Sequence, residues 1–457
     1  MLYFSALSSF ALDLKGLQNA HDPGTITKDG DTYFNFTTGT GIWYSTSTDL
    51  ITWNGGAGPV FSAANYPSWI ASNFPNWAKG DFWAPDLIQM NGYYYLYYSV
   101  TDTFGQSKSA IGVARSASLK NPSWTDLGIV IQSSTAAGQI NAIDASLFRD
   151  FDGKVYMSYG SFFGGIGVAE INQGTGKLAT NVTKVLGGNG LDMEGATITR
   201  NGAYYYLFVN RGNCCTNPLT STTYSMEVYR ASSVLGPYSS GGTMMPTIDS
   251  AAPTRRGPGH VGILKQDGCN YVSTHYVDTA DGGAKLQIMK MTYGSNGWPV
   301  LTRNFTNISS CGGVSDGLYT VKSGYSGNLM TVAGASKTNG AMVQQASSTV
   351  AKNQQWYVIG HGDTYYSIIN ANSLLSLDDY DNSTSSGTPI AQWGYWGGNG
   401  QQWNLIGSGS SYKVKNRLSG MMVDVNQNTS ANAQLIQLPV NASGNANSSQ
   451  LWSLTRK

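Results

Sequence analysis

Three acidic residues and a histidine recur at one position ahead of a repeated phrase. Asp22, Asp144, Glu194 and His260 each lie seven or eight residues before an Asn-Gly or Asp-Gly pair. Two carboxyl groups suffice to hydrolyse a glycosidic bond, because a neutral one protonates the leaving oxygen while an ionised one attacks the sugar or activates water. A third carboxylate would raise the pKa of the acid by like-charge repulsion. The competing interpretation is a metal site, since carboxylates and imidazole also hold cations.

The phrase that defines this spacing occurs five times, with copies that begin at Asp29, Asn91, Asp152, Asn201 and Asp267. Each is an Asn-Gly or Asp-Gly turn followed by aromatic and β-branched residues, which is a strong hairpin signal. An antiparallel unit repeated at this length predicts the blades of a five-bladed propeller. The innermost strand of each blade lines the central channel, so we expect the four residues to converge near the axis. The second blade has Ala84 at this position, beside Trp83.

A second kind of repeat follows residue 313. Gln-x-Trp occurs at Gln354, Gln401 and Gln450, with spacings of 47 and 49 residues. Three such repeats resemble the ricin-type β-trefoil, a sugar-binding module in which Gln-x-Trp closes each lobe. The plain alternative is that these residues only pack the lobes. We therefore expect an all-β chain with a five-bladed β-propeller over residues 1–308 and a β-trefoil over residues 314–457.

Sugar-binding lobes of this trefoil type usually carry an acid ahead of an aromatic platform. The resemblance aligns Thr331, Ser376 and Asp424 with that acid, so only the third lobe keeps it. Asp424 is therefore the candidate sugar-binding residue of the trefoil. The second lobe is rich in aromatic residues and offers Asp378 and Asp379 in place of Ser376. We expect binding in one lobe, or weak binding, and not three equal sites.

Composition narrows the choice of partner. The formal net charge is +1 and only 12% of the residues are charged, so no strong field attracts nucleic acid or an anionic membrane. No apolar run after the start of the chain approaches the roughly 20 residues needed to cross a bilayer. Residues 1–12 are apolar and are either a clipped signal peptide or a first strand. Cys269 and Cys311 are a candidate disulfide, whereas adjacent Cys214 and Cys215 are not expected to pair with each other.

Several short motifs, in one order, resemble glycoside hydrolase family 43 and its arabinanase branch. Over about residues 15–305 they are HDP at 21–23, FWAPD at 82–86, SAIG at 109–112, NAIDA at 141–145, GSF at 160–162 and GPGH at 257–260. The resemblance implies that Asp22 is the general base, that Asp144 tunes and orients the acid, and that Glu194 is the general acid. It also implies inversion, for which base and acid stand about 6.5–9.5 Å apart with a water between them.

The same resemblance assigns residues around the acids. Trp83 and Phe104 would form aromatic walls for furanose rings, and Asn141 and Ser161 would hydrogen-bond sugar hydroxyls. No cofactor is required for the chemistry. His260 would lie on the axis below the site, close to a calcium-like ion with many water ligands, although a plain core histidine is an equal alternative.

One departure from the family pattern concerns the acid. Arabinanases usually follow it with Ala-Pro, whereas this chain has Gly195 and Ala196 after Glu194. On a strand, Asp192 would face the same side as Glu194, so Asp192 is a rival for the role of the acid.

These features predict a secreted, monomeric glycoside hydrolase that cleaves α-1,5-L-arabinofuranosyl linkages within arabinan by single displacement. Its partner would be plant cell-wall polysaccharide, meaning arabinan or related hemicellulose and pectin side chains, which the trefoil holds near the propeller. The alternatives on the same scaffold are an exo-acting α-L-arabinofuranosidase, a β-xylosidase and a galactanase. A catalytically inactive lectin is the alternative from another class, and the intact set of acids argues against it.

Overall fold

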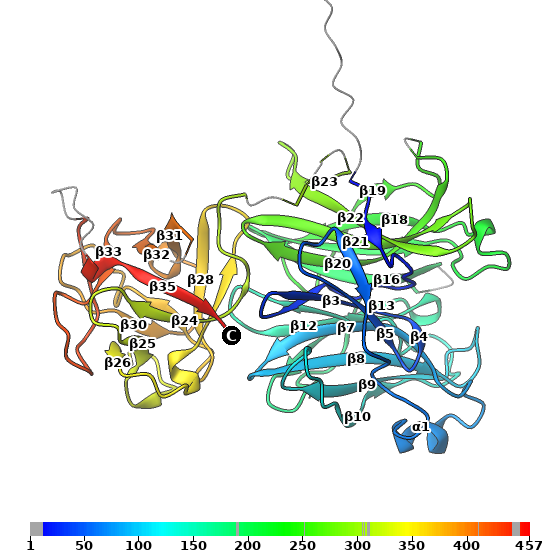
Figure 1. The fold of residues 1–457 in the computed structure, drawn as a ribbon, viewed down its shortest axis with the longest axis horizontal. Helices are drawn as coiled ribbons and strands as arrows, with labels where there is room; N and C mark the ends of the chain where they lie inside the picture. Colours follow the sequence, from blue (N-terminus) through cyan, green and yellow to red (C-terminus); the bar gives the residue numbers. More distant parts are fainter. Residues whose placement is uncertain are drawn as a thin grey trace, which may run out of the picture.

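The computed structural model describes residues 12–188, 192–250, 252–303, 305, 307–308, 311–409, 411–440 and 448–457. The chain is nearly all β and forms two bodies side by side, a propeller drawn in blue to green and a smaller trefoil drawn in yellow to red (Figure 1). The predicted fold class is therefore confirmed. Residues 1–11, which hold almost all of the predicted signal peptide or first strand, lie outside the described residues. Within the described ranges, no helix has the length and apolar character to span a membrane.

The first three blades are sheets that follow one another along the chain. Blade one contains β1 (Lys15–Gly16), β2 (Thr27–Asp29), β3 (Thr32–Thr37), β5 (Trp43–Ser47) and β6 (Thr52–Gly55). Blade two contains β7 (Asp81–Met90), β8 (Tyr93–Thr101), β9 (Ser109–Ser116) and β10 (Thr125–Gln132), which follow the short helix α1 (Ser68–Asn73), and β4 (Gly39–Thr40), which lies earlier in the chain between β3 and β5 and pairs with β7. Blade three contains β11 (Ser146–Arg149), β12 (Val155–Tyr159), β13 (Ile166–Asn172), β14 (Lys177–Leu178) and β15 (Thr183–Leu186).

The last two blades have four strands each. Blade four contains β16 (Met193–Asn201), β17 (Tyr204–Arg211), β18 (Ser225–Ala231) and β19 (Ser239–Met245). Blade five contains β20 (Arg255–Gln266), β21 (Cys269–Asp278), β22 (Ala284–Tyr293) and β23 (Pro299–Thr302). The innermost strands of the five blades are thus β2, β7, β11, β16 and β20.

The repeated turns join the innermost strand of a blade to the next strand. Between β7 and β8, Asn91 has a φ of 53° and Gly92 a φ of 80°, and Asp267 and Gly268 repeat this pattern between β20 and β21 with 49° and 77°. Two consecutive residues with positive φ make the tight turn whose twist suits a hairpin, and Asn, Asp and Gly tolerate that backbone best. The predicted hairpins form for this local reason.

The start of the described chain closes the ring of blades. The N–H of Leu286 in β22 donates to the carbonyl of Gln18 at 2.7 Å, and the N–H of Ala20 donates to the carbonyl of Ala284 at 3.1 Å. The segment between β1 and β2 of blade one therefore pairs with β22 of blade five. Such closure covers the edges that an open sheet would leave exposed.

The described residues of the trefoil form twelve short strands. They are β24 (Gly317–Ser323), β25 (Leu329–Val332), β26 (Val343–Ala346), β27 (Trp356–Gly360), β28 (Tyr365–Asn370), β29 (Ser376–Asp378), β30 (Ala391–Trp393), β31 (Trp403–Ser408), β32 (Ser411–Asn416), β33 (Met422–Asp424), β34 (Ile436–Leu438) and β35 (Trp452–Arg456). The three Gln-x-Trp tryptophans, Trp356, Trp403 and Trp452, are fully buried together in its core.

Hydrogen bonds from these tryptophans fix the alignment of the three lobes. Their indole N–H groups donate at 3.0–3.1 Å to the carbonyls of Met330, Leu377 and Val423 respectively. The residues that follow these acceptors are equivalent, and they are Thr331, Asp378 and Asp424. The alignment of Ser376 was therefore wrong by two residues, because Leu374, with a φ of 58°, belongs to the turn before β29 and not to the strand.

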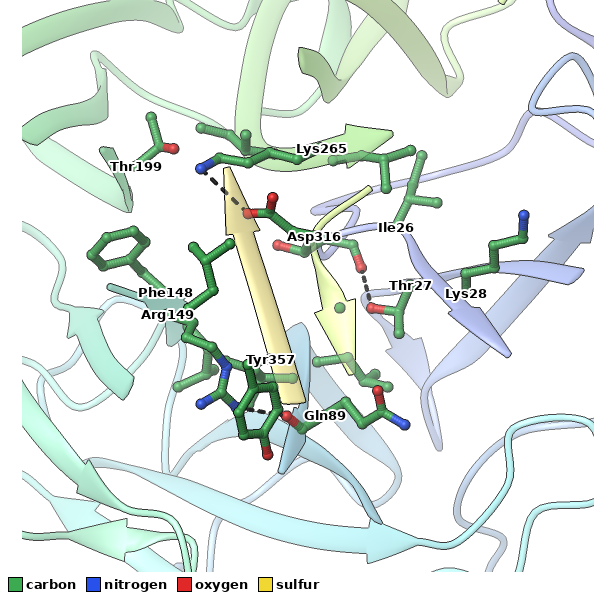
Figure 2. Close-up of a pocket in the computed structure, with 18 of the residues that line it drawn as sticks. Ile26, Thr27, Lys28, Gln89, Phe148, Arg149, Thr199, Lys265, Asp316 and Tyr357 are labelled. Carbon is green, nitrogen blue, oxygen red and sulfur yellow. Dashed lines mark hydrogen bonds and ion pairs between the residues drawn. The ribbon is translucent and has the colours of Figure 1, made fainter. Parts of the chain in front are cut away.

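The trefoil covers the end of the propeller axis where the innermost strands finish. A cavity of about 190 Å³ lies between the two bodies and is lined by residues of all five blades, together with Asp316, Tyr357 and Arg456 of the trefoil. Across it, Lys265 Nζ lies 3.4 Å from Asp316 Oδ2, and the guanidinium of Arg149 lies 3.8 Å from the centroid of the Tyr357 ring (Figure 2). The trefoil is thus docked on the propeller.

A shared apolar cluster strengthens this junction. Phe151 of the propeller is buried with Leu318, Tyr357 and Ile359 of the trefoil, and its ring stacks on that of His361 with centroids 4.0 Å apart. The predicted disulfide between Cys269 and Cys311 is present and ties blade five to the segment that leads into the trefoil.

Candidate active site

A cavity of about 820 Å³ lies at the opposite end of the axis, near the start of the innermost strands. Seven of the nine predicted site residues line it: Asp22, Trp83, Phe104, Asn141, Asp144, Ser161 and Glu194. Among those that do not, His260 is buried, with its Nδ1 atom 3.9 Å from Asp22 Oδ1. The other, Asp424, belongs to the trefoil. The fold therefore brings the three predicted catalytic carboxyl groups into one cleft.

Each blade positions this cleft with one residue of left-handed backbone in or just before its innermost strand. These residues are Asp22, Ala84, Asp144, Gly195 and His260, with φ between 42° and 62°. Their N–H groups donate over 2.8–3.1 Å to side chains of the preceding blade, in turn His275, Thr38, Ser99, Asp144 and Asn210. Such conformations persist where the surroundings hold them and are common at active sites. In the fourth blade the equivalent residue is Gly195, so the alignment that used Glu194 was wrong by one.

Asp22 is held as an ionised carboxylate. Its Oδ2 accepts a hydrogen bond from Thr38 Oγ1 at 2.7 Å and lies 3.0 Å from His21 Nδ1. Burial alone would raise the pKa of Asp22, but the charge and hydrogen bond of His21, with His260 and His275 near by, hold it well below its usual range. A carboxylate that stays ionised in a cleft has the property that a general base needs.

Glu194 has the opposite character. Burial raises its pKa, and the nearby charge of Asp22 raises it further, while hydrogen bonds from Ser161 and Tyr224 partly oppose this. Ser161 Oγ donates to Glu194 Oε2 at 2.6 Å, and the Tyr224 hydroxyl donates to Oε1. A carboxyl group with a raised pKa keeps its proton at higher pH and is suited to general acid catalysis. The prediction that Ser161 binds a sugar hydroxyl stays a prediction.

Asp144 lies directly behind the acid. Its Oδ2 accepts the backbone N–H of Gly195 at 3.1 Å, which fixes the residue next to Glu194. Burial, together with the charges of Glu194 and Asp22, raises the pKa of Asp144 well above its usual range. The three carboxyl groups therefore ionise at different pH, Asp22 before Asp144 and Glu194.

The Tyr224 hydroxyl gives a test of this electrostatic arrangement. A hydrogen bond to the ionised carboxylate favours that form, so Tyr224→Phe should raise the pKa of Glu194. Because the acid must be protonated, hydrolysis is lost as pH rises through that pKa, and the alkaline limb of the kcat profile should move to higher pH. Tyr229→Phe is the matched control, since its hydroxyl bonds Glu227 at 2.7 Å outside the cleft. An alkaline limb that stays in place in Tyr224→Phe would contradict this role.

Aromatic side chains form one wall of the cleft. The Trp83 and Phe104 rings meet edge to face with centroids 5.9 Å apart, and Trp83 Nε1 donates to Asp81 Oδ2 at 2.8 Å. Phe104 is 70% exposed, so it offers an apolar surface to solvent at the rim. Asn141 is buried and accepts a hydrogen bond from Ser133 Oγ at 3.4 Å. These groups leave an amphipathic surface of the kind that sugars bind.

The rival acid Asp192 does not line the cleft. Its Oδ1 accepts bonds from Arg211 Nε and Nη2 at 3.0 and 2.7 Å, and its Oδ2 accepts the Gly212 N–H at 3.1 Å. Both oxygens of the Asp192 carboxylate are thus engaged by Arg211 and Gly212, outside the lining of the cleft. The geometry therefore favours Glu194.

Sequence reasoning gave no role to three other residues of the site. The rings of His21 and His275 stack at 4.7 Å, and the ring of Tyr224 stacks on His275 at 6.1 Å, so an aromatic column runs beside the base and the acid. Burial disfavours the charged form of His21, but Asp22 outweighs this and raises the pKa of His21. The sequence did hold a signal for the two histidines. His21 begins the HDP motif and His275 ends the fifth repeated phrase, in a chain with only four histidines.

The pairing of Cys214 with Cys215 was predicted wrongly. These adjacent residues form a disulfide in the loop after β17, at the edge of the cleft. The prediction expected backbone strain to keep adjacent cysteines from pairing. Cys215 has a left-handed φ of 53°.

Among the described residues, a cation beside His260 would have the His260 imidazole and the Asp22 carboxylate near by. Burial lowers the pKa of His260, so its imidazole is neutral and able to act as a ligand. Asp22 Oδ1 lies 3.9 Å from His260 Nδ1, and the other oxygen of Asp22, Oδ2, lies 3.0 Å from His21 Nδ1. Calcium takes six to eight oxygen ligands, so an ion here fits only if water supplies most of them.

The trefoil offers its strongest candidate site in the second lobe. Asp378 is buried and its Oδ2 accepts a hydrogen bond from Gln401 Nε2 at 2.9 Å, while Trp393 and Trp396 are exposed within the same lobe. Asp424 is also buried, and its Oδ1 accepts the N–H of Asn426 at 2.6 Å. Among the described residues of the third lobe, no exposed tryptophan or tyrosine accompanies Asp424.

A five-bladed propeller with two half-buried carboxyl groups, displaced in opposite directions in pKa inside one cleft, has the arrangement that glycoside hydrolysis requires. The chain belongs to glycosyl hydrolases family 43, whose sequence model matches residues 17–299. Residues 304–393 and 399–457 match the ricin-type beta-trefoil lectin domain-like family. Both resemblances seen in the sequence are therefore confirmed.

Similar proteins fall on both sides of the endo and exo distinction. A probable arabinan endo-1,5-alpha-L-arabinosidase A from Neosartorya fischeri is 35% identical over 63% of this chain and 92% of its own. The extracellular exo-alpha-(1->5)-L-arabinofuranosidase ArbA from Cellvibrio japonicus is 33% identical over 62% and 86%. The solved GH43 endo-arabinanase from Bacillus licheniformis is 34% identical, covers 63% of this chain and 99% of its own, and superposes with a TM-score of 0.57.

Proposed function

We propose that this enzyme hydrolyses α-1,5-L-arabinofuranosyl linkages within arabinan, with inversion at the anomeric carbon. The observation that carries the proposal is the opposite displacement of the pKa values of Asp22 and Glu194 in one cleft. The names of the similar family 43 proteins supply the substrate.

The catalytic step assigns one task to each carboxyl group. Ionised Asp22 accepts a proton from a water molecule as that water attacks the anomeric carbon. Glu194 gives its proton to the leaving oxygen in the same step. Asp144 acts as a positioning residue through its bond to the N–H of Gly195. Water enters and the linkage breaks in a single displacement, so the product has the inverted configuration.

An exo-acting arabinofuranosidase is the second candidate, because a protein named for that activity is 33% identical to this chain. Product analysis separates the two. The purified enzyme is incubated with linear arabinan and followed by NMR and chromatography from the first minutes. Short oligosaccharides with β-configured reducing ends support inverting endo hydrolysis, and monomer alone supports the exo candidate. No product from arabinan, xylan or galactan would contradict both and leave the lectin.

We also propose that the enzyme is secreted, acts on plant cell-wall polysaccharide outside the cell and is a monomer. Similar proteins named as extracellular support the location. A trefoil that binds the same polysaccharide would raise the local substrate concentration at the cleft without adding a catalytic group.

The trefoil proposal rests on its second lobe. Trp396→Ala, which removes the most exposed tryptophan of that lobe, should weaken binding to insoluble polysaccharide by about 5–10-fold, because an aromatic contact with a sugar ring is worth about 1–1.4 kcal/mol. Asp378→Asn should act in the same direction. Pull-down with polysaccharide measures this, and hydrolysis of soluble arabino-oligosaccharides should be unchanged. Asp424→Asn is the matched control, and a loss of binding in it alone would move the site to the third lobe.

We also propose that a hydrated, calcium-like cation binds beside His260. A structural role for such an ion predicts that chelation lowers the melting temperature and that added calcium restores it, since a ligand that binds only the folded state stabilises it. His260→Ala should remove the response to calcium. A melting temperature that ignores both chelator and calcium would favour the plain core histidine.

A further inference from the structure

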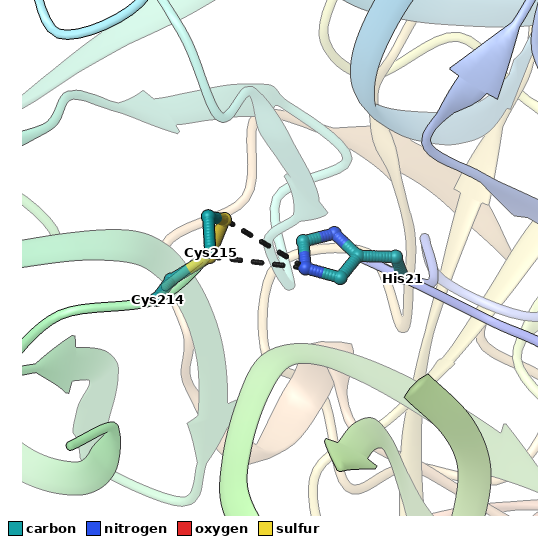
Figure 3. Close-up of side chains that lie close together, drawn as sticks. All are labelled: His21, Cys214 and Cys215. Carbon is teal, nitrogen blue, oxygen red and sulfur yellow. Dashed lines mark hydrogen bonds between the residues drawn. A yellow bond between two sulfur atoms is a disulfide. The ribbon is translucent and has the colours of Figure 1, made fainter. Parts of the chain in front are cut away.

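One corner of the cleft holds three side chains with the ligand atoms of a transition-metal site. His21 precedes β2, whereas Cys214 and Cys215 lie in the loop after β17, and the two segments meet at the edge of the cavity (Figure 3). His21 Nε2 lies 3.8 Å from Cys214 Sγ and 3.7 Å from Cys215 Sγ. His21 and Cys214 are half-buried and Cys215 is exposed, so reagents in solvent reach the disulfide.

We propose that reduction of the Cys214–Cys215 disulfide creates a binding site for a thiophilic divalent cation such as Zn²⁺, with the two thiolates and the His21 imidazole as ligands. Two sulfurs and one nitrogen from the protein, with a fourth position open to the cleft, form a ligand set that zinc accepts.

The distances fit a tetrahedral ion. With metal–sulfur bonds of about 2.3 Å and metal–nitrogen bonds of about 2.0 Å, tetrahedral angles place sulfur and nitrogen about 3.5 Å apart. In the disulfide form the observed separations, 3.8 and 3.7 Å, are slightly longer than this. Two thiolates on one ion must stand about 3.8 Å apart. The Cα atoms of the two cysteines are 3.8 Å apart, so rotation of the freed side chains is enough to reach that spacing.

A second observation points to the same ligand. His21 Nδ1 lies 3.0 Å from Asp22 Oδ2, and a carboxylate in that position accepts the Nδ1 proton. The lone pair of the neutral ring is then on Nε2, which is the atom that faces both sulfurs. Histidines that bind metals commonly donate their other N–H to a carboxylate in this way, which orients the ring and strengthens the ligand.

The chemistry balances with a phosphine as reductant. The phosphine is oxidised to its oxide with oxygen from water, the disulfide bond breaks, and two thiols form. Zinc binding then releases the two thiol protons, so the ion and its two thiolates carry no net charge. At the edge of the cleft, the ion would bind the imidazole of His21, whose other ring nitrogen lies beside the Asp22 carboxylate. This metal site goes beyond the hydrolytic function, and zinc would inhibit the reduced enzyme only.

The primary test uses the full chain and does not depend on hydrolysis. Protein reduced with the phosphine and freed of it without oxygen is titrated with Co²⁺, and a thiolate-to-cobalt absorption band should grow to one equivalent and vanish when Zn²⁺ is added. Oxidised protein should show no band. Cys214→Ser/Cys215→Ser is the matched control, because it keeps the Cys269–Cys311 pair, and after the same reduction it should also show none.

Two results would overturn the site. One is phosphine-treated protein that shows no cobalt band. This outcome counts against the site if free-thiol titration finds both thiols, and it counts equally if the titration shows that the phosphine cannot reduce the disulfide. The other is an equal band in the double-serine variant.

Asp22→Asn should weaken cobalt binding about 10–100-fold if the carboxylate orients His21. Hydrolysis is a separate readout: zinc should slow the reduced enzyme about 10²-fold, as loss of a general base does, and a chelator should restore it. An unchanged rate with zinc bound would overturn the inhibition alone.

Discussion

Asp22→Asn is expected to abolish turnover while leaving the fold and substrate binding in place. The amide has nearly the shape of the carboxylate but cannot take a proton from water, so the attack on the anomeric carbon loses its general base. A fall in kcat of about 10²–10⁴-fold is the size that general acid–base catalysis supports. Among the described residues that line the cleft, Asp144 and Asp81 are poor substitutes for this base, because burial raises the pKa of both carboxyl groups.

The measurement is the initial rate of reducing-end release from linear arabinan at saturating substrate. Calorimetric binding of an arabino-oligosaccharide and the thermal melting curve show whether the cleft and fold survive. Asp31→Asn, at an exposed carboxylate far along the blade, is the control for the substitution itself. Normal turnover in Asp22→Asn would refute the assigned mechanism.

Glu194→Gln should lower kcat on arabinan by about 10²–10⁴-fold for a different reason. An alkoxide leaving group needs a proton as the bond breaks, and the amide has none to give. A substrate with an acidic phenol as leaving group does not need that proton, so its hydrolysis should be slowed far less. The alkaline limb of the pH profile should also disappear, because the group whose deprotonation ends activity has been removed.

Comparing arabinan with an aryl arabinofuranoside, over a range of pH, separates loss of the acid from loss of the fold. Asp192→Asn is the sharpest control, since Asp192 was the rival acid and is paired with Arg211. Equal losses on both substrates would place Glu194 in binding or folding. A selective loss on arabinan in Asp192→Asn would transfer the acid role to Asp192.

Local and repeated features of this protein were decided by its sequence alone. A turn such as Asn91-Gly92 forms because two adjacent residues tolerate positive φ, and no distant contact is needed. Five copies of that turn therefore revealed the number of blades, and counting back from them found Asp22, Asp144 and His260 at equivalent positions. The order of the short motifs was enough to identify the family, and the spacing of the Gln-x-Trp repeats was enough to predict the trefoil.

Counting residues from a repeated motif could not show which residue of an irregular strand occupies a given structural position. The count placed Glu194 at the axial position, but the kink falls at Gly195, where the N–H bonds Asp144. In the trefoil the count chose Ser376, but the indole of Trp403 selects Leu377 and hence Asp378. Both errors come from a residue of left-handed backbone, which shifts the alternation of side chains on which counting depends.

Only the tertiary structure decided which distant groups meet. Asp22 and His275 are 253 positions apart, yet the N–H of one donates to the ring of the other. Tyr224 reaches Glu194, His21 reaches the paired cysteines, and the trefoil closes the far end of the axis through contacts such as Lys265 with Asp316. Hydrogen-bond partners and burial set the pKa values of the carboxyl groups, and both arise only when the ring of blades closes. Sequence alone thus indicated which acids could act, and the closed ring decided which holds a proton and which does not.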